Sequence, residues 1–217
     1  MNTEEMYIKW MVCEVKEGKK QEFSLAQDTW VKTADAKGFI AQAGGWDLKN
    51  NSEACIISFW DSKNSLEHFM DDLHDTIFYK NKQADTYNWI AVSHFIDNLN
   101  IEGKSDILRN AIKTNKSLCI ADCYLNSEKS VHFEKVMKEI WTPGMGRAEG
   151  IPGGIFSKSS NNNLRYLLST FLDHMENNNN HLLNLLTVYG NKSTINDDIT
   201  KMEERVIRLV DSWQIIK

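Results

Sequence analysis

His74 is the residue in this sequence whose type and setting best suit acid-base chemistry. The apolar residues around it recur at the spacing of one helix face: Leu66, Phe69, Met70, Leu73 and Ile77. His74 lies at the border of this apolar arc, whereas His68 points away from it. A histidine beside an apolar cavity can act as a general base or orient a substrate, because its pKa lies near neutrality. The alternative is a half-buried structural histidine bonded to a backbone carbonyl or a neighbouring carboxylate.

Tryptophan is concentrated near the start of the sequence, where it can shape an apolar pocket for a flat ligand. Four of the seven tryptophans lie there: Trp10, Trp30, Trp46 and Trp60. Trp46 follows Gly44 and Gly45, and such a pair lets a ligand or another backbone approach a strand closely. With Phe69 and Met70 from the helix, the four tryptophans form the substrate-binding set that we predict. The alternative is that they fill an ordinary core.

The acidic residues beside His74 are of kinds that can bind a metal ion, but their positions on the predicted helix do not suit a metal site. Asp71 and Asp72 fall on the outer side of the predicted helix, so we expect solvated charge there. The sequence also lacks a GxGxxG motif, a P-loop, an HExxH motif and a Ser/His/Asp signature. We predict no metal site and no cofactor.

Composition narrows the class of protein. The 217 residues are 41% hydrophobic and 25% charged, as in soluble globular proteins, and suit two units of roughly 100 residues. No apolar run approaches the ~20 residues that span a bilayer, and the acidic N-terminus does not resemble a secretory signal. The formal charge of −5 argues against a nucleic-acid partner. Four cysteines without a CxxC motif indicate reduced thiols, and hence a cytoplasmic protein.

The sequence contains an internal repeat with an offset of about 110 residues. The segments that begin it correspond as Cys13 to Cys123 and Phe23 to Phe133. The later ones correspond as Gly44-Gly45-Trp46 to Gly153-Gly154-Ile155 and as Phe59-Trp60-Asp61 to Phe171-Leu172-Asp173. A repeat with a fixed offset of about half the chain indicates a duplicated domain.

Each half is predicted to follow the βαββαβ order of a ferredoxin-like unit. For the first half we expect strands at 7–15, 39–49, 54–60 and 89–95, with helices at 19–36 and from residue 61 or 62 onward. For the second half we expect strands at 118–125, 154–158, 164–172 and 205–215, with helices at 128–141 and 178–186.

The predicted first strand carries large apolar residues on both faces. Ile8, Trp10 and Val12 lie on one side, and Tyr7, Met11, Cys13 and Val15 lie on the other. Since helices cover only one face of each sheet, the other face needs a second sheet. We therefore predict an α+β protein in which two ferredoxin-like units pack their antiparallel sheets face to face into a pseudo-dimeric α+β barrel.

The repeat gives the expected domain boundaries. We place the first unit at residues 1–97, a linker with a short helix near 107–112 at residues 98–116, and the second unit at residues 117–217. Residues 142–154 contain both prolines and five glycines, so we expect a long loop there with little regular structure.

Several segments of the first half together resemble a known superfamily: Ile8-Lys9-Trp10, Gly44-Gly45-Trp46, Phe59-Trp60, Phe69-Met70 and His74-Asp75. On these residues the sequence is similar to the dimeric α+β barrel proteins of the antibiotic-biosynthesis-monooxygenase type, and the first half to a bacterial family of unassigned function among them. The resemblance implies a barrel built from two units. It also implies oxidation of quinone-like or polycyclic aromatics by O2 without metal or flavin, haem degradation, or an unknown activity.

The haem-degrading branch of that superfamily uses an asparagine on the first strand and a tryptophan and a histidine on the second long helix. Here the first strand has no asparagine, and Phe69 stands where the tryptophan would be. We do not expect haem degradation.

The two halves differ at the candidate site. Ile155 and, on the simplest alignment, Leu186 replace Trp46 and His74 in the second half, so we place any site in the first. We expect a monooxygenase-like enzyme that acts on a small apolar or aromatic molecule. The alternatives are a non-catalytic module that binds or senses such a molecule, and a purely structural protein. Because the repeat covers its own apolar face, we expect a monomer or a weak homodimer.

Overall fold

The structure is a computed structural model, and it describes residues 5–101, 105–148, 150–172 and 194–217. The chain divides into two compact units, and each is described by itself. The first unit comprises Met1–His94 and Ile207–Lys217, and the second comprises Phe95–Val206. The C-terminal segment thus belongs to the first unit, although the repeat in the sequence had placed it in the second half.

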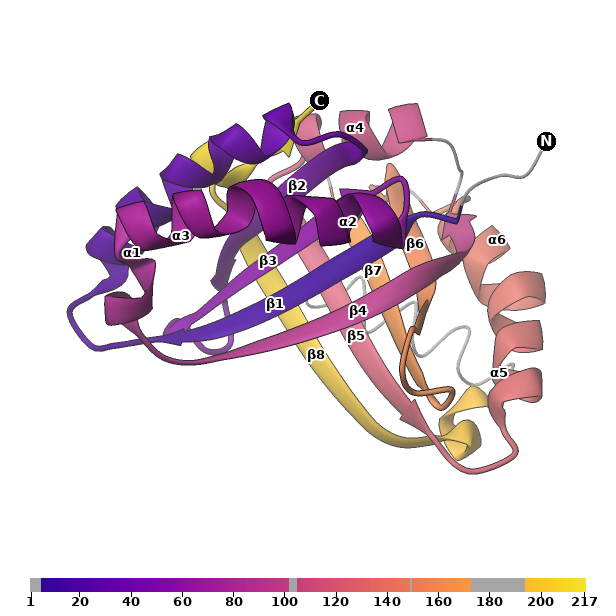
Figure 1. Cartoon of the computed structure of the whole chain (residues 1–217). Helices are drawn as coiled ribbons and strands as arrows, with labels where there is room; N and C mark the ends of the chain where they lie inside the picture. The colour runs from indigo at the N-terminus through magenta and orange to yellow at the C-terminus, as the bar shows by residue number, and fades with distance from the viewer. Residues whose placement is uncertain (1–4, 102–104, 149, 173–193) are drawn as a thin grey trace. The chain divides into compact units, whose positions relative to one another are not determined.

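Antiparallel strands form the sheet of the first unit (Figure 1). They are β1 (Tyr7–Val15), β2 (Phe39–Asp47), β3 (Glu53–Trp60) and the first part of β4 (Tyr87–Ile101). β1 pairs with β3 from Tyr7↔Trp60 to Glu14↔Glu53, and β2 pairs with the other edge of β3. The C-terminal segment adds the end of β8 (Ile199–Leu209) and β9 (Ile215–Ile216), which pair with β2.

The first helical segment changes its winding part-way. α1 (Lys20–Asp28) is an α-helix, and Thr29–Asp35 continues it as a 3-10 helix, whereas the sequence had predicted one α-helix to residue 36. Thr29 and Thr33 are β-branched, and the Thr29 hydroxyl donates to the carbonyl of Ala26 at 2.7 Å, which competes with α-helical bonding. In a 3-10 helix residues i and i+3 align, so Trp30 and Thr33 share one face.

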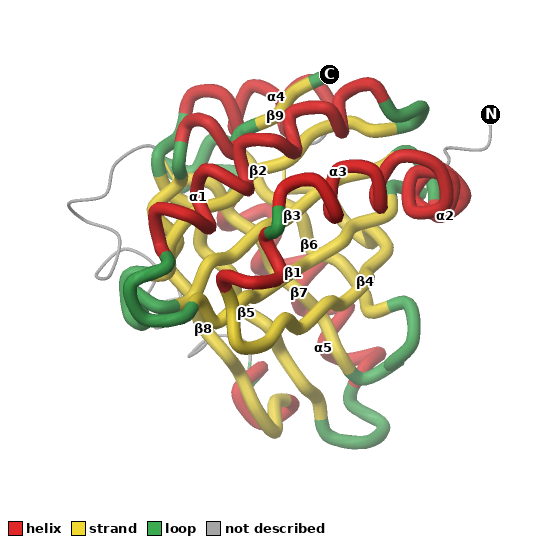
Figure 2. The backbone as a smooth tube through the Cα atoms, turned by 60° about the vertical axis from the view of Figure 1, so that its left-hand side comes forward, coloured by secondary structure: helices red, strands yellow, loops and turns green. Residues whose placement is uncertain are grey.

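The second helical segment has three parts: α2 (Lys63–Phe69), a π-helical turn at Met70–His74 and α3 (Asp75–Asn81). Ser62 is its N-cap, because its Oγ accepts from the Ser65 backbone N–H at 3.2 Å, and it is one of the two residues, 61 or 62, at which the sequence predicts the helix to begin. Figure 2 shows this segment and α1 on the same side of the strands of the first unit. A π-turn widens the helix by one residue and often occurs at functional sites.

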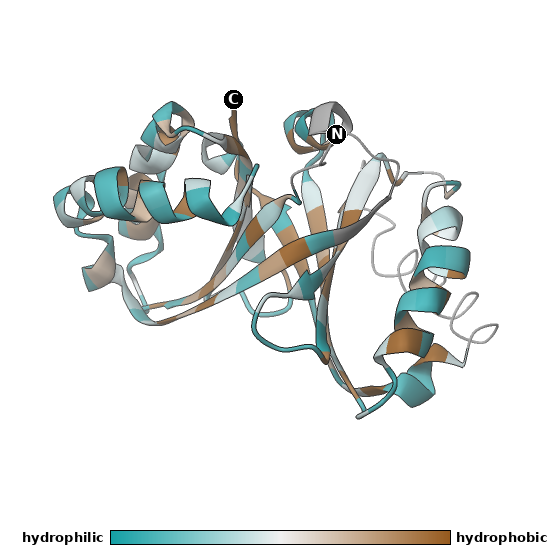
Figure 3. Cartoon of the chain, turned by 45° about the vertical axis from the view of Figure 1, so that its right-hand side comes forward, coloured by the Kyte–Doolittle hydropathy of each residue, from teal (hydrophilic) through white to brown (hydrophobic). Residues whose placement is uncertain are grey.

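The core of the first unit lies on both faces of its strands. Ile8 and Trp10 are buried on one face of β1, and Tyr7 and Cys13 on the face that the helices cover. In Figure 3 the helices that cover this sheet are mostly in the teal of hydrophilic residues, with brown apolar residues between them. The demand for burial on both faces of the first strand is therefore confirmed.

The second unit repeats part of this pattern. Its strands are β5 (Ser117–Leu125), β6 (Gly153–Ser159), β7 (Arg165–Leu172) and parts of β4 and β8, in the order β4-β6-β7-β5-β8. Helices are α4 (Ser105–Thr114), α5 (Ser130–Val136), a π-turn at Met137–Trp141 and α6 (Thr142–Met145). Phe133, Trp141, Phe156 and Tyr166 belong to its buried core.

Four expected boundaries need correction. The strand expected at 89–95 runs from Tyr87 to Ile101, and the strand expected at 205–215 is β8, a 3-10 turn at Asp211–Trp213 and β9. The expected loop at 142–154 begins as helix α6, since Pro143 is favourable in a first helical turn, and ends in β6. The expected short helix at 107–112 extends over Ser105–Thr114. The helix expected at 178–186 lies outside the described residues.

The antiparallel α+β class is confirmed. Within the described residues, no helix combines the length and the apolar character that crossing a membrane requires.

Candidate functional site

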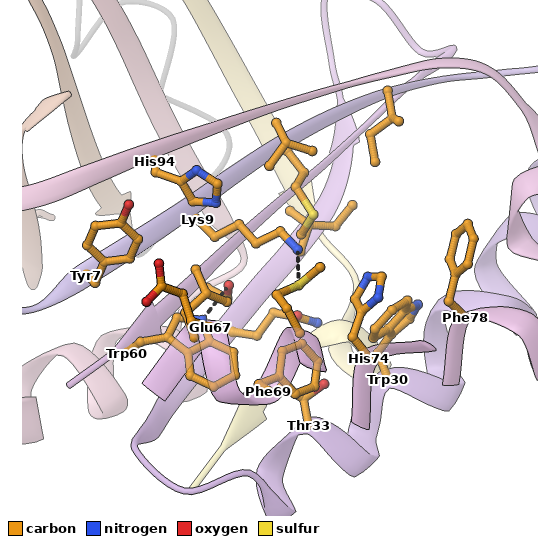
Figure 4. A pocket seen from close by; sticks show the side chains of 18 of the residues that line it. Tyr7, Lys9, Trp30, Thr33, Trp60, Glu67, Phe69, His74, Phe78 and His94 are labelled. Atoms are coloured by element: carbon orange, nitrogen blue, oxygen red, sulfur yellow. Dashed lines mark hydrogen bonds between the residues drawn. The ribbon is translucent and has the colours of Figure 1, made fainter. Parts of the chain in front are cut away.

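A cavity of about 760 Å³ lies in the first unit, between the strands and the helices that cover them (Figure 4). Lys9 and Cys13 of β1 and Trp60 of β3 are on its sheet wall, and Trp30 and His74 are on its helical wall. All residues that line it belong to the first unit. Its volume falls within the range of small-molecule sites, ~300–1,000 Å³.

Aromatic rings form much of the helical wall. The His74 ring lies 5.3 Å from that of Trp30, 5.9 Å from that of Phe69 and 5.6 Å from that of Phe78, on which it stacks. Phe69 also packs on Trp60, with ring centroids 5.0 Å apart. The Trp30 indole N–H donates to Gln83 Oε1 at 2.7 Å, which fixes the ring. Such a wall suits a flat apolar molecule.

His74 closes the π-helical turn and reaches the cavity, with 17% of its side chain exposed. Its Nδ1 lies 3.0 Å from Asp75 Oδ1. Because a carboxylate can only accept, this bond assigns the proton to Nδ1 and leaves the lone pair on Nε2. Burial lowers the pKa of His74, and the Asp75 hydrogen bond partly opposes the effect. His74 is therefore neutral at pH 7 and able to accept a proton.

Lys9 places an ammonium group inside the cavity without a carboxylate partner. The residue is 8% exposed, and the described residues offer its Nζ one hydrogen-bond acceptor, Met70 Sδ at 3.5 Å (Figure 4). A thioether is a weak acceptor. Burial lowers the pKa of Lys9 to about 8. At pH 7 about nine-tenths of the lysine is still protonated.

The charged and titratable groups around Lys9 do not neutralise it. The Cys13 thiol stays protonated, because burial raises its pKa to about 12. Glu67 and Asp71 line the cavity but are exposed, and Glu67 pairs with Lys63 at 3.0 Å. The remaining titratable lining groups are Tyr7, His74, Tyr87 and His94.

His94 and Thr33 are two further polar residues of the lining, which also includes Gln27, Gln42, Ser58 and Gln83. The His94 ring stacks on Tyr7 at 5.6 Å, and its pKa is lowered by burial first and then by Lys9 and Lys63. Thr33 is 2% exposed, and its hydroxyl has no hydrogen-bond partner among the described residues. A buried unpartnered hydroxyl is costly unless a ligand or water satisfies it.

Most of the predicted site residues meet in this cavity. Trp30, Trp60, Phe69, Met70 and His74 all line it. The acidic neighbours Asp71 and Asp72 are exposed, and the described residues contain no group of three or more His, Cys, Asp or Glu side chains placed to hold a metal ion.

The other two predicted tryptophans, Trp10 and Trp46, do not line this cavity. Trp10 is one residue beyond Lys9 on a strand, so its side chain points to the opposite face of the sheet. Trp46 packs on Phe23 at 5.8 Å and on Trp213 at 5.5 Å. The glycine pair before Trp46 accommodates another strand rather than a ligand, since a Cβ on Gly45 would lie 1.9 Å from the carbonyl oxygen of Arg208.

The sequence reasoning missed Lys9, Thr33 and His94. Lys9 gave a usable signal: it alternates with Tyr7 and Met11 on a predicted buried strand face, where it is the single charged side chain. Thr33 gave none, because its inward position depends on the 3-10 winding after Thr29.

Two comparisons of sequence bear on this unit. Residues 7–95 match a domain of unknown function, DUF4937. The uncharacterized protein YdbC of Bacillus subtilis (strain 168) is 40% identical over 80 residues, which are 36% of this chain and 67% of that protein. The chain belongs to the DUF4937 family. All the lining residues of the cavity from Tyr7 to His94 lie within the part that matches this family.

Solved structures show the same fold over nearly the whole chain. A candidate monooxygenase from Fusobacterium nucleatum subsp. nucleatum has a TM-score of 0.77 at 12% identity, covering 100% of this chain and 96% of that one. A candidate monooxygenase from Lactobacillus acidophilus NCFM has a TM-score of 0.71 at 11% identity, covering 99% and 100%. An anthrone oxidase-like protein has a TM-score of 0.71 at 6% identity, covering 96% and 92%. These neighbours are of the dimeric α+β barrel type, and at these identities the likeness concerns the fold.

Proposed function

We propose that this DUF4937 protein is a cofactor-independent monooxygenase that binds a flat apolar or aromatic molecule in the cavity of its first unit. The observation that carries the proposal is the pairing, in one aromatic-walled cavity of about 760 Å³, of a neutral histidine with a buried ammonium group. The neighbours named as candidate monooxygenases and as anthrone oxidase-like support the same class of reaction.

The first step of the proposed reaction is the transfer of a proton from the substrate to His74. His74 Nε2 accepts a proton from an activated C–H or O–H of a substrate such as anthrone, because Nδ1 already donates to Asp75. The Lys9 ammonium stabilises the resulting carbanion or oxyanion, and its effect is large because the cavity excludes much of the solvent. An electron-rich anion of this kind reduces O2 directly.

The reaction balances without another reductant. The methylene carbon of anthrone loses two hydrogens and gains one oxygen atom as a carbonyl, while the second oxygen atom leaves as water with those two hydrogens. The substrate therefore supplies all four electrons that O2 requires. In this scheme His74 is the catalytic base and Lys9 the electrostatic group.

Oxygen uptake tests the proposal. The purified protein is mixed with anthrone in an oxygen electrode at pH 7, and the quinone product is followed by absorbance. We expect uptake of one O2 for each quinone formed, at a rate above the uncatalysed autoxidation. Binding of anthrone without any acceleration would reject the oxygenase and favour the alternative, a module that binds or senses such molecules.

The architecture and assembly form a second part of the proposal. We infer that the chain folds as two fused ferredoxin-like units forming a pseudo-dimeric barrel, as a monomer or a weak homodimer in the cytoplasm. The internal repeat, the barrel type of the structural neighbours and the four buried free cysteines support it. Light scattering that shows an obligate dimer would contradict the assembly.

A further inference from the structure

We propose that the natural ligand of the cavity is a flat aromatic molecule with a single oxyanion, a carboxylate or a phenolate, and that the Lys9 ammonium binds this oxyanion. The inference deepens the proposed function and rests on the cavity being the binding site. It concerns the charge of the ligand, which the oxygenase proposal alone does not fix.

The burial of Lys9 indicates that its ammonium group binds a negatively charged partner. Lysine is almost never buried without one, because an isolated ammonium loses its hydration on burial. Yet Lys9, the third residue of β1, is 8% exposed, its Nζ lies 3.5 Å from Met70 Sδ, and the described residues place no carboxylate within an ion-pair distance of 4.0 Å. A structural lysine would be expected to reach an acceptor of its own. An anionic ligand supplies the missing one.

The charges of the other groups in the cavity indicate that the ligand carries one negative charge. His74 and His94 both have lowered pKa values and add no positive charge at pH 7. Lys63 is exposed and already paired with Glu67. Lys9 is thus the buried cation that a ligand meets, and one oxyanion balances it.

The other lining residues indicate the shape of the ligand that carries the oxyanion. Trp30, Phe69 and His74 present their rings from the helical wall, across the cavity from β1 and Lys9 (Figure 4). The unpartnered Thr33 hydroxyl also comes from the helical side. A flat ring system held between the walls can direct its oxyanion to Lys9 and a second polar group, such as a carbonyl, to Thr33.

Matched ligands test the charge. Affinities of 2-naphthoate and of its neutral isostere 2-naphthamide are measured at pH 7 by titration calorimetry on the wild type, Lys9→Met and Lys80→Met. Lys80 is an exposed lysine on α3 outside the cavity, so Lys80→Met controls for loss of one positive charge. In a third titration, the absorbance of 2-naphthol reports whether the phenol binds in its ionised form.

We expect wild type and Lys80→Met to bind naphthoate at least tenfold tighter than naphthamide, because a charge-assisted hydrogen bond in a desolvated site is strong. Lys9→Met should lose this preference while its affinity for naphthamide changes less than twofold. Ionised 2-naphthol bound by wild type, but not by Lys9→Met, would assign the oxyanion to a phenolate. Equal affinities together with un-ionised naphthol, a preference that survives in Lys9→Met, or no binding of any probe would overturn the inference.

Oxygen uptake separates this inference from the oxygenase. Anion preference that depends on Lys9, without uptake on any aromatic substrate, supports the anion site and rejects the oxygenase. Oxygen uptake with anthrone, without a preference for anionic ligands, supports the oxygenase and rejects the anion site.

Discussion

Replacing Lys9 by methionine is expected to stabilise the folded protein in the absence of ligand. Methionine has a similar length and suits the Met11 and Met70 side chains that line the same cavity. The substitution removes the ammonium group of a residue that is 8% exposed, and this group's hydrogen bond is to a thioether. It deletes a buried charge without opening a large hole, so the electrostatic gain is not masked by a packing loss.

The magnitude follows from the pKa of Lys9. Burial lowers it from 10.5 to about 8. At 1.36 kcal/mol for each pH unit, this interval corresponds to about 3 kcal/mol by which the buried charge destabilises the fold at pH 7. We expect Lys9→Met to recover about 1–3 kcal/mol, because local packing offsets part of the gain.

The pH dependence of stability tests a second time whether the buried Lys9 charge destabilises the fold. Between pH 8 and 10.5 the unfolded chain holds a proton on Lys9 that the folded protein has released, so the contribution of Lys9 to the stability of the wild type rises with pH through this window. The penalty is fully present below pH 8. The advantage of Lys9→Met should therefore be largest at pH 7 and small near pH 10.5. Burial raises the pKa of Cys13 to about 12, so Cys13 ionises in the unfolded chain first and opposes this trend, but it does so in both proteins and cancels from the difference between them.

Urea denaturation of the wild type, Lys9→Met and Lys80→Met at pH 7 and at pH 10 measures these differences. Lys80→Met should lie within about 0.5 kcal/mol of the wild type, as for most surface substitutions. A Lys9→Met protein that is less stable than the wild type at pH 7, or a difference that does not change with pH, would refute the reasoning. Lys9 would then have a compensating partner in the folded protein.

Three other predictions concern the site and the strands that frame it. His74→Asn should lower anthrone-dependent oxygen uptake at least ~100-fold, as expected for loss of a general base, while His68→Asn leaves it unchanged; equal rates would remove His74 from the mechanism. The melting temperature should fall as the pH drops below about 6.5, because burial lowers the pKa of His74 and His94 and the unfolded chain then binds more protons; a flat profile from pH 8 to 5 would contradict this. Gly45→Ala should cost more than ~2 kcal/mol in urea denaturation, since its Cβ would meet a backbone carbonyl of β8 at 1.9 Å, whereas Trp46→Leu should lower stability without changing naphthoate affinity. Loss of affinity in Trp46→Leu would return Trp46 to the site.

Local patterns in the sequence were enough to predict the elements and much of the helical wall. Runs rich in β-branched and aromatic residues predicted β1 and β3, and the helical spacing of Leu66, Phe69 and Met70 predicted the helix that carries His74. These features depend on local composition and side-chain periodicity, which are properties of neighbouring residues. The start of this helix at residue 61 or 62 was predictable for the same reason, because a cap bonds within its own turn; the structure assigns the cap to Ser62.

Tertiary structure decided what each inward-facing side chain meets. Trp46 followed a glycine pair that could equally admit a ligand or a strand, and the choice was made by Trp213 and the end of β8, more than 160 residues later in the chain. The 3-10 winding that turns Thr33 inward and the π-turn that ends at His74 changed faces that a regular helical wheel assigns. Lys9 was visible as a charge on an apolar strand, but its lack of a partner depends on the absence of a nearby carboxylate among the described residues. Periodicity fixes the direction of a side chain, whereas its desolvation and its partners depend on segments that are distant in sequence.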